Sequence, residues 1–382
     1  MVAADALAPA ATVTSRGTEE PPAIGIYVHI PFCRTLCPYC DFIRCHTDRA
    51  VPHEFVNTLC REIAAFDGPE RACTIYLGGG TPSLLALDSL AQVLDALHAR
   101  FTFQVEPEVT IEANPDDVTA ELAASWRALG VNRVSLGVQS FDDRVLRYLG
   151  RRHDADTARR ACTLAADRFE NWSIDLIFGA HPIEAWESTL SECVACAPTH
   201  VSAYGLTYEP NTPFGARAGE AVDDDTSLDL YRRAKAQLAA YDRYEISNFA
   251  LTGRRCAHNL IYWRNEEYAG FGPGAYSFLD GLRPRNTPDV DTYLADPRTK
   301  SESLPLSDAE IRLETVIQHL RLREGLPKPY YALRFGRDLR DDFAESLDAL
   351  IARGLIVENE DAIKPTETGF ELNNELGLAL VD

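Results

Sequence analysis

The most constraining feature of this chain is a regular alternation of short apolar runs and longer amphipathic stretches over residues 24–206. In the stretch 83–101, apolar residues return at three- and four-residue spacing, which is typical of a surface helix. Strands separated by such helices pair in parallel, because each helix crosses back over the sheet. Six strands are predicted, at residues 24–30, 74–79, 109–114, 133–138, 173–179 and 200–206.

The number of strand–helix units predicts the architecture. Eight units would close a TIM barrel, whereas six predict an α/β fold in the form of a partial (β/α)6 TIM-like barrel with one open side. In such folds the chemistry gathers at the carboxyl ends of the strands, where the loops converge. The notable motifs lie at this end, after the first five predicted strands: a cysteine loop, then GGGTP, EANP, GVQSFD and DLIFGAHP.

The whole chain divides into four parts by its sequence pattern. Residues 1–23 have neither a basic start nor a long apolar core, so we expect a disordered leader rather than a signal peptide. The barrel is expected over 24–250, ending in a helix at 223–241 and a short strand at 244–250. Residues 251–300 form a Gly- and aromatic-rich connection without a sustained period. Residues 301–382 predict a smaller C-terminal helical domain, with a helix, a second helix and a hairpin in a winged-helix-like order.

Composition narrows the class of protein. Ten cysteines without a secretory signal indicate a reducing, cytoplasmic setting. The sequence has no run of 18 or more apolar residues, so we expect no membrane span. The formal net charge of -21 argues against a nucleic-acid partner, which would require clustered Lys and Arg. The C-terminal domain shows no basic face, and we interpret it as a structural part or a lid.

Three cysteines at CxxxCxxC spacing, Cys33, Cys37 and Cys40, follow the first predicted strand. A 4Fe-4S cluster normally takes four thiolates, so three would leave one iron open to a small ligand. A zinc site would need further ligands, for which His46 is the nearby candidate. Disulfides suit small secreted domains instead. The open cluster is the preferred interpretation.

The string around these cysteines, YVHIPFC followed by CxxCDF, resembles the radical S-adenosylmethionine (SAM) enzymes. The similar branch contains the oxygen-independent coproporphyrinogen III oxidases and the HemW-type haem chaperones, and the resemblance covers residues 24–380. It implies a partial barrel of the radical SAM type, a 4Fe-4S cluster and SAM bound at the open iron.

Polar and glycine residues at the strand ends are the candidate SAM ligands. Glycines permit close approach of a ligand to the backbone, although GGGTP could also be a plain tight turn. Glu112 could cap the next helix, and Asp175, inside an apolar strand, could form a structural salt bridge. Arg152 competes with Arg151. The resemblance implies a SAM pocket made of Tyr27, Tyr39, Gly79, Gly80, Thr81, Glu112, Gln139, Arg151 and Asp175.

Two further features separate the relatives. The oxidases continue their motif with a fourth cysteine, at a position that is Phe42 here, and Cys45 comes three residues too late. Residues 258–263, HNLIYW, match the HNxxYW signature of the HemW-type chaperones, which implies a haem site at His258, Asn259, Tyr262 and Trp263. Histidine is a standard axial ligand of haem iron, and the aromatic faces suit a porphyrin. The alternative is a packed core histidine.

These features predict a haem chaperone that binds a 4Fe-4S cluster, SAM and haem and passes haem to acceptor proteins such as respiratory enzymes. An outside donor must then reduce the cluster. The competing hypotheses are a coproporphyrinogen III oxidase that makes protoporphyrinogen IX, and a SAM-binding protein whose cluster is purely structural. Whether the chain is an enzyme, forms a homodimer or touches the membrane surface is open at this level.

Overall fold

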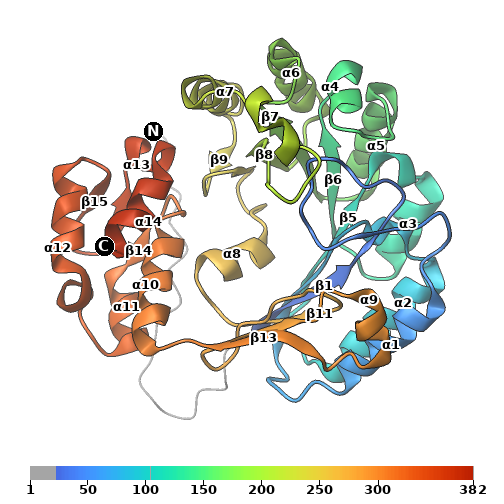
Figure 1. The fold of residues 1–382 in the computed structure, drawn as a ribbon, viewed down its shortest axis with the longest axis horizontal. Coiled ribbons are helices and arrows are strands. Elements are labelled where there is room, and N and C mark those ends of the chain that lie inside the picture. The colour runs from blue at the N-terminus through green and yellow to red at the C-terminus, as the bar shows by residue number, and fades with distance from the viewer. Residues whose placement is uncertain (1–22, 104, 382) are drawn as a thin grey trace, which may run out of the picture.

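The computed structural model describes residues 23–103 and 105–381, so the predicted leader lies, except for its last residue, outside the described residues. A curved sheet forms its centre (Figure 1). Each of the six strands predicted over residues 24–206 is present to within two residues at either end. The six strands are β1 (Ile24–Ile30), β4 (Ala72–Gly79), β5 (Glu108–Ala113), β6 (Arg133–Gln139), β7 (Asn171–Phe178) and β8 (His200–Gly205). They are neighbours in this order and all parallel.

Helices connect these strands and lie on the outer side of the sheet (Figure 1). The predicted helix 83–101 begins later, at Leu87, after a single 3-10 turn. The helices are α1 (His53–Ala64), α2 (Leu87–Arg100), α3 (Ala120–Ala128), α4 (Asp143–Tyr148), α5 (Ala155–Arg168), α6 (Trp186–Cys196) and α7 (Asp224–Gln237).

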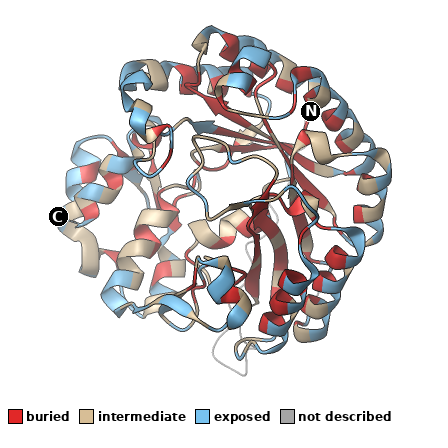
Figure 2. Cartoon of the chain, turned by 45° about the vertical axis from the view of Figure 1, so that its right-hand side comes forward, coloured by how far each residue is buried: buried red, intermediate tan, exposed pale blue. Residues whose placement is uncertain are grey.

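The core lies between the sheet and these outer helices. Ile24, Ile26 and Val28 of β1 are fully buried in one cluster with helix residues such as Phe55 and Leu59 of α1. Figure 2 shows the strands as the most continuously buried part of the chain. Because side chains alternate along a strand, the residues between these positions, such as Tyr27, point to the inner face. The inner face is therefore the one that can carry a site.

The sheet extends beyond the six strands at both edges and does not close. On one edge β11 (Tyr268–Phe271) pairs with β1 in parallel. On the other, β10 (Asn248–Ala250) pairs antiparallel with β8, and β9 (Asp242–Arg243) with β10. The predicted strand 244–250 is thus confined to its last three residues. The open side lies between these edges, as an incomplete barrel requires.

The segment 251–300, predicted as a connection without a sustained period, contains several short elements. They are α8 (Ala257–Trp263), β11, β12 (Leu282–Asn286) and α9 (Val290–Ala295), and β12 forms a hairpin with β13 (Lys300–Pro305). Elements of four to seven residues are too short to show a period in the sequence, which is why the pattern missed them.

The C-terminal part has its own small core. Helix α10 begins at a capping box formed by Ser307 and Glu310, in which each side chain bonds to the other's backbone N–H. The structure adds three helices, α11, α13 and α14, to the predicted two helices and hairpin, and it adds the strand β14, which gives a three-stranded sheet. The elements are α10 (Asp308–His319), β14 (Leu326–Pro327), α11 (Lys328–Phe335), α12 (Leu339–Ala352), β15 (Ile356–Glu358), β16 (Ala362–Pro365), α13 (Glu367–Glu371) and α14 (Asn373–Val381).

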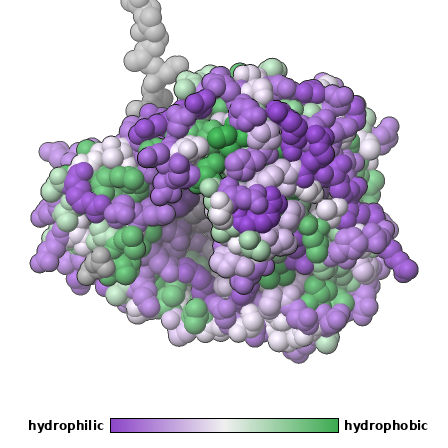
Figure 3. Space-filling model, turned by 45° about the horizontal axis from the view of Figure 1, so that its top comes forward, coloured by the Kyte–Doolittle hydropathy of each residue, from purple (hydrophilic) through white to green (hydrophobic). Residues whose placement is uncertain are grey.

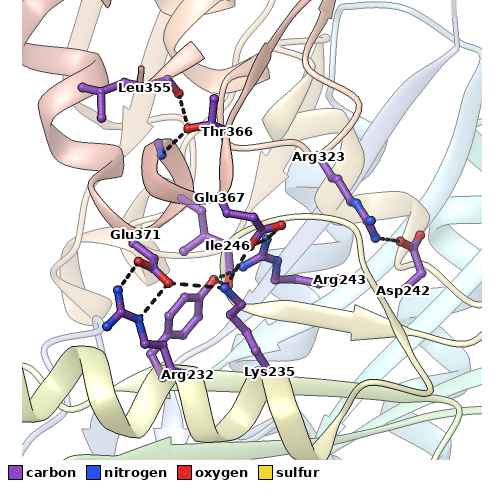
Figure 4. A network of polar contacts seen from close by, with 12 residues as sticks. Arg232, Lys235, Asp242, Arg243, Ile246, Arg323, Leu355, Thr366, Glu367 and Glu371 are labelled. Atoms are coloured by element: carbon purple, nitrogen blue, oxygen red, sulfur yellow. Dashed lines mark hydrogen bonds and ion pairs between the residues drawn. The ribbon is translucent and has the colours of Figure 1, made fainter. Parts of the chain in front are cut away.

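Ion pairs hold the C-terminal part against the barrel (Figure 4). Arg232 and Lys235 of α7 contact the Glu371 carboxylate, at 2.7 and 3.3 Å. Arg243 donates from Nη2 to both oxygens of Glu367 at 2.8 Å, and its own side chain is buried. Single exposed pairs contribute little, whereas a network with a buried arginine fixes an orientation. The C-terminal part therefore faces the open side of the sheet (Figure 1).

Candidate functional site

The cysteine loop leaves the end of β1 and is closed by two very short strands. These are β2 (Phe32–Cys33) and β3 (Cys45–His46), which pair in parallel. Cys45 donates its backbone N–H to Pro31 O at 2.7 Å, and Cys40 donates its own to Cys37 O at 3.2 Å. The loop is thus pinned at its base, and Cys33, Cys37 and Cys40 lie within it.

The three thiols line one cavity of about 380 Å3 at the carboxyl ends of the strands. Cys33 Sγ accepts a bond from Thr81 Oγ1 at 3.5 Å, and Cys37 Sγ accepts one from Arg151 Nη1 at 3.4 Å. Burial raises the pKa of Cys33 and of Cys40, and Cys37 raises both further. Such thiols need a positive partner to become thiolates.

These observations discriminate among the metal hypotheses. No three His, Cys, Asp or Glu of the described residues converge closely enough to hold a single metal ion. All ten cysteines are free thiols, so no disulfide is present, and His46 pairs with Asp48 at 3.3 Å. Three thiols spread around a shared cavity, with Arg44 and Arg151 beside them, fit a multinuclear iron–sulfur cluster better than zinc.

The GGGTP turn packs directly against the cysteine loop. Gly80 donates its N–H to Ile30 O at 2.8 Å, and a Cβ on Gly80 would lie 2.7 Å from the carbonyl carbon of Pro31. Gly79 has φ of +111°, and a Cβ there would lie 2.5 Å from the His29 ring. The glycines therefore serve the packing of the cysteine loop as well as the approach of a ligand.

Glu112, at the end of β5, is the acid closest to this turn. It accepts hydrogen bonds from the Tyr76 hydroxyl at 2.8 Å and from the Gly79 N–H at 3.2 Å. Burial raises the pKa of Glu112 to about 7, and the charge of Asp175 acts in the same direction. The carboxylate is therefore poised for a ligand with a positive charge, which would favour its ionised form.

Arg151 and Arg152, the two candidates for binding the SAM carboxylate, have different partners. Arg151 is held by Cys37, by Gly137 O at 2.8 Å from Nη2 and by the Asn114 side chain. Arg152 forms an ion pair with Asp116 at 2.7 Å. Both line the cavity, but the guanidinium of Arg151 is the one beside the cysteines.

Asp175 takes hydroxyl partners in place of the salt bridge considered from its sequence context. Ser135 donates to both carboxylate oxygens, at 2.9 and 3.1 Å, and Ser173 donates at 3.2 Å. Burial raises the pKa of Asp175, whereas Ser202 and the charge of Arg133 lower it. Tyr39 and Gln139 line the same cavity, and Gln139 has φ of +67°.

A second cavity, of about 350 Å3, lies beside α8 and is lined by the His, Asn, Tyr and Trp residues of HNLIYW. His258 is 1% exposed, and its ring stacks on Tyr76 with centroids 5.1 Å apart. Its Nδ1 is bonded to Thr74 Oγ1 and its Nε2 to the Tyr262 hydroxyl, each at 2.8 Å. Burial, aided by the charge of Arg133, lowers the pKa of His258 to about 3. In this conformation both ring nitrogens are engaged.

The two cavities are neighbours and share part of their lining. Tyr76, Glu112, Tyr204 and Asn259 line both of them. Tyr27, expected beside the cluster cysteines, lines the second cavity instead. Figure 3 shows the surface hollowed between the barrel and the C-terminal part. A ligand in either cavity would therefore lie next to the same four side chains.

Several lining residues were missed by the sequence analysis. They lie at inward-facing positions of the strands. Three of them, Tyr76, Ser135 and Ser202, are in register with the predicted site residues Tyr27, Glu112 and Asp175 on a neighbouring strand. Strand runs were treated as continuously apolar, so polar residues alternating with buried ones went unnoticed, although a period of two was the available signal. The missed lining residues of the strands are Tyr76, Arg133, Ser135, Ser202 and Tyr204, and Thr74, which contacts His258, was missed as well.

Both parts of the fold match known families. Residues 27–192 match the radical SAM superfamily, and residues 306–372 match the HemN C-terminal domain. The chain is therefore a radical SAM protein with a HemN-type C-terminal domain. Curated relatives narrow this class, and they show that the chain belongs to the HemW family.

Three relatives illustrate the similarity. Heme chaperone HemW of Escherichia coli (strain K12) is 35% identical over 94% of this chain and 99% of its own. The protein of the same name from Bacillus subtilis (strain 168) is 33% identical over 92% and 97%. That of Mycobacterium tuberculosis (strain ATCC 25618 / H37Rv) is 36% identical over 90% and 91%. The predicted family is thereby confirmed.

A solved structure supports the fold. Coproporphyrinogen III oxidase (HemN) from Escherichia coli, described as a radical SAM enzyme, matches with a TM-score of 0.81 and 23% identity, over 94% of this chain and 90% of that chain. At this identity the match concerns the fold alone. It confirms the predicted partial barrel with a smaller C-terminal domain. No helix within the described ranges is long and apolar enough to cross a membrane.

Proposed function

We propose that this chain is a haem chaperone that binds a 4Fe-4S cluster, SAM and haem and passes haem to acceptor proteins such as respiratory enzymes. The observation that carries the proposal is that the cavity beside HNLIYW and the cavity of the three cysteines share four lining residues. The near full-length similarity to proteins named heme chaperone HemW supports it.

In this proposal Cys33, Cys37 and Cys40 hold the cluster, and the positive charges of Arg44 and Arg151 favour their thiolate forms. When bound, the cluster supplies an electron and an iron with a free coordination position. The chain's part is to present three thiols on a pinned loop and to keep a fourth protein ligand away. Phe42, at the position of a fourth cysteine, is 65% exposed.

The first cavity is proposed to take SAM. The carboxylate of Glu112 suits the ammonium or the sulfonium group of SAM, because a nearby cation offsets the cost of burying its negative charge. Arg151 suits the carboxylate through its guanidinium. The proposed SAM residues remain Tyr39, Gly79, Gly80, Thr81, Glu112, Gln139, Arg151 and Asp175, with Tyr27 at the boundary toward the second cavity.

The second cavity and the recess beside it are proposed to take haem at His258, Asn259, Tyr262 and Trp263. Tyr262 and Trp263 offer aromatic faces to a porphyrin. His258 becomes available as an axial ligand when its bond to the Tyr262 hydroxyl opens. Until then it holds α8 against β4 through Thr74.

The remaining expectations are part of the same proposal. We propose the division into a barrel at 24–250, a haem-binding connection at 251–300 and a C-terminal domain at 301–382. The free thiols suit a reducing cytoplasm. An external reductant is needed, and the charge of -21 disfavours nucleic acid as a partner.

The decisive experiment sets chaperone against oxidase. Anaerobically reconstituted protein is supplied with reductant, SAM and coproporphyrinogen III, and in parallel with haem followed by an apo-acceptor. We expect stoichiometric haem uptake, transfer to the acceptor and no protoporphyrinogen IX. Conversion of coproporphyrinogen III to protoporphyrinogen IX would overturn the proposal in favour of the oxidase. Formation of 5'-deoxyadenosine would rule out a purely structural cluster.

A further inference from the structure

The second cavity contains polar atoms that have no hydrogen-bond partner among the described residues. They are Glu245 Oε2, Asn248 Oδ1, Trp263 Nε1 and Arg321 Nε, and all four residues line this one cavity. Glu245 is 0% and Asn248 2% exposed. A buried polar atom without a partner costs free energy, so four of them around one cavity indicate a polar ligand.

The acidic side of this cavity is rigidly held. Glu245 lies in the turn between β9 and β10, where its Oε1 accepts bonds from the Ser247 N–H and from Asn248 Nδ2, both at 2.7 Å. These bonds fix the carboxyl plane and the Asn248 amide, so Oε2 and Oδ1 remain for a ligand. Burial raises the pKa of Glu245, although Arg321 and the bonds from Ser247 and Asn248 oppose this.

The basic side comes from the C-terminal part. Arg321 lies in the turn after α10, next to Leu322, whose backbone bridges to Glu245. Its guanidinium carbon lies 4.3 Å from the centre of the Trp263 ring. Its Nη2 is 3.8 Å from Glu245 Oε2, which is beyond hydrogen-bond distance. The arginine is thus stacked in place without a hydrogen-bonded carboxylate, although one lies close by.

The charge of Arg321 decides the ligand class. A cation could bind to Glu245 Oε2 and Asn248 Oδ1. The positively charged guanidinium of Arg321, 3.8 Å from Glu245 Oε2, would however repel it. A carboxylate can instead accept from Arg321 and from the indole N–H of Trp263, the last residue of HNLIYW. Haem carries two propionate carboxylates, which can fix the orientation of a porphyrin plane that lies beside aromatic faces.

We infer that the cavity beside α8 binds a propionate arm of the haem, with Arg321 and Trp263 Nε1 as its hydrogen-bond donors. The inference rests on the proposed function and deepens it, because it gives the C-terminal domain a part in holding the cargo. Arg321 is then the residue that orients haem, and the barrel and the C-terminal domain bind it jointly.

The test is titration of the full chain with haem and with haem dimethyl ester, in which both carboxylates are masked. Wild type is expected to bind haem about tenfold more tightly than the ester, as a charge-assisted hydrogen bond implies. Arg321→Met should weaken haem about tenfold and leave the ester unchanged, and Arg321→Lys should retain part of the preference. Arg323→Met is the matched control, since Arg323 is exposed, pairs with Asp242 and does not line the cavity.

Other outcomes overturn specific claims. Equal affinity of wild type for haem and ester, or an unchanged preference in Arg321→Met, would overturn the propionate site while haem binding itself stands. Failure of wild type to bind either compound would overturn the proposed function and this inference with it. Glu245→Gln keeps the Oε1 contacts and should preserve or increase haem affinity. A marked loss of haem in this variant would show that the acceptors, and not Arg321, hold the ligand.

Discussion

The ring of His258 is hydrogen-bonded to Thr74 Oγ1 at 2.8 Å, between residues 184 positions apart in the chain. This bond joins α8 to β4, and with the Tyr262 bond it engages both ring nitrogens. The histidine is therefore a packed residue at rest, whatever it does when haem is present.

His258→Ala should lose haem binding and also destabilise the chain. The substitution removes a buried ring and leaves the Thr74 and Tyr262 hydroxyls without their partner, so we expect a cost of roughly 2–4 kcal/mol. Haem titration and urea unfolding measure the two effects. Tyr262→Phe is the informative companion, because it frees Nε2 and keeps the ring packed. If His258 is the axial ligand, Tyr262→Phe should retain haem and its absorption spectrum. Unaltered haem affinity in His258→Ala would contradict this role.

Glu112 should make stability depend on pH. Burial raises its pKa to about 7 in the folded chain, from an ordinary value of 4.5. Between these values the folded chain keeps a proton that the unfolded chain has released, so the free energy of unfolding should fall as the pH rises. The site contributes about 3 kcal/mol across that range. Urea unfolding of cluster-free protein at pH 5 and pH 8 measures it. Between pH 5 and pH 8, the free energy of unfolding of Glu112→Gln should fall by about 3 kcal/mol less than that of wild type. Equal falls in the two proteins would refute the raised pKa of Glu112.

Gly80→Ala should disturb the cysteine loop. The added methyl group would lie 2.7 Å from the Pro31 carbonyl carbon, so backbone must move. We expect a cost of about 1–3 kcal/mol and less iron per chain after reconstitution. Gly219→Ala is the control, since no described atom lies within 4 Å of its added Cβ. The packing argument fails if both variants melt and bind iron like wild type.

Cys37→Ala should abolish both the cluster and SAM cleavage. The thiolates of Cys33 and Cys40 cannot hold the cluster alone, and the guanidinium of Arg151 cannot serve as a third ligand. Iron content and 5'-deoxyadenosine formation should therefore fall together. Cys60→Ala serves as the control, because Cys60 lies on α1 and does not line the cavity. A variant with full iron content would mean that another residue completes the site.

Sequence patterns located the strands and the cluster loop because both are local. Each strand is a short run of mainly apolar residues, and the three cysteines lie within eight residues. Short elements such as β11 and α11 escaped, since the four residues of β11 are too few to stand out as a run and the eight residues of α11 span only about two helical turns. The salt-bridge alternative for Asp175 failed because hydroxyl groups surround its carboxylate, and two of them, on Ser135 and Ser202, come from the neighbouring strands β6 and β8, which no local pattern shows.

By itself the sequence determined the class of this protein: the six parallel strands, the three-cysteine loop and the HNLIYW segment. Only the tertiary structure decided how these meet. It placed Tyr27 in the second cavity, engaged both nitrogens of His258, and brought Arg321 and Glu245 to one cavity. The physical reason is that such contacts join residues far apart in the chain. Their distances are determined by the packing of helices and strands, which no local pattern contains.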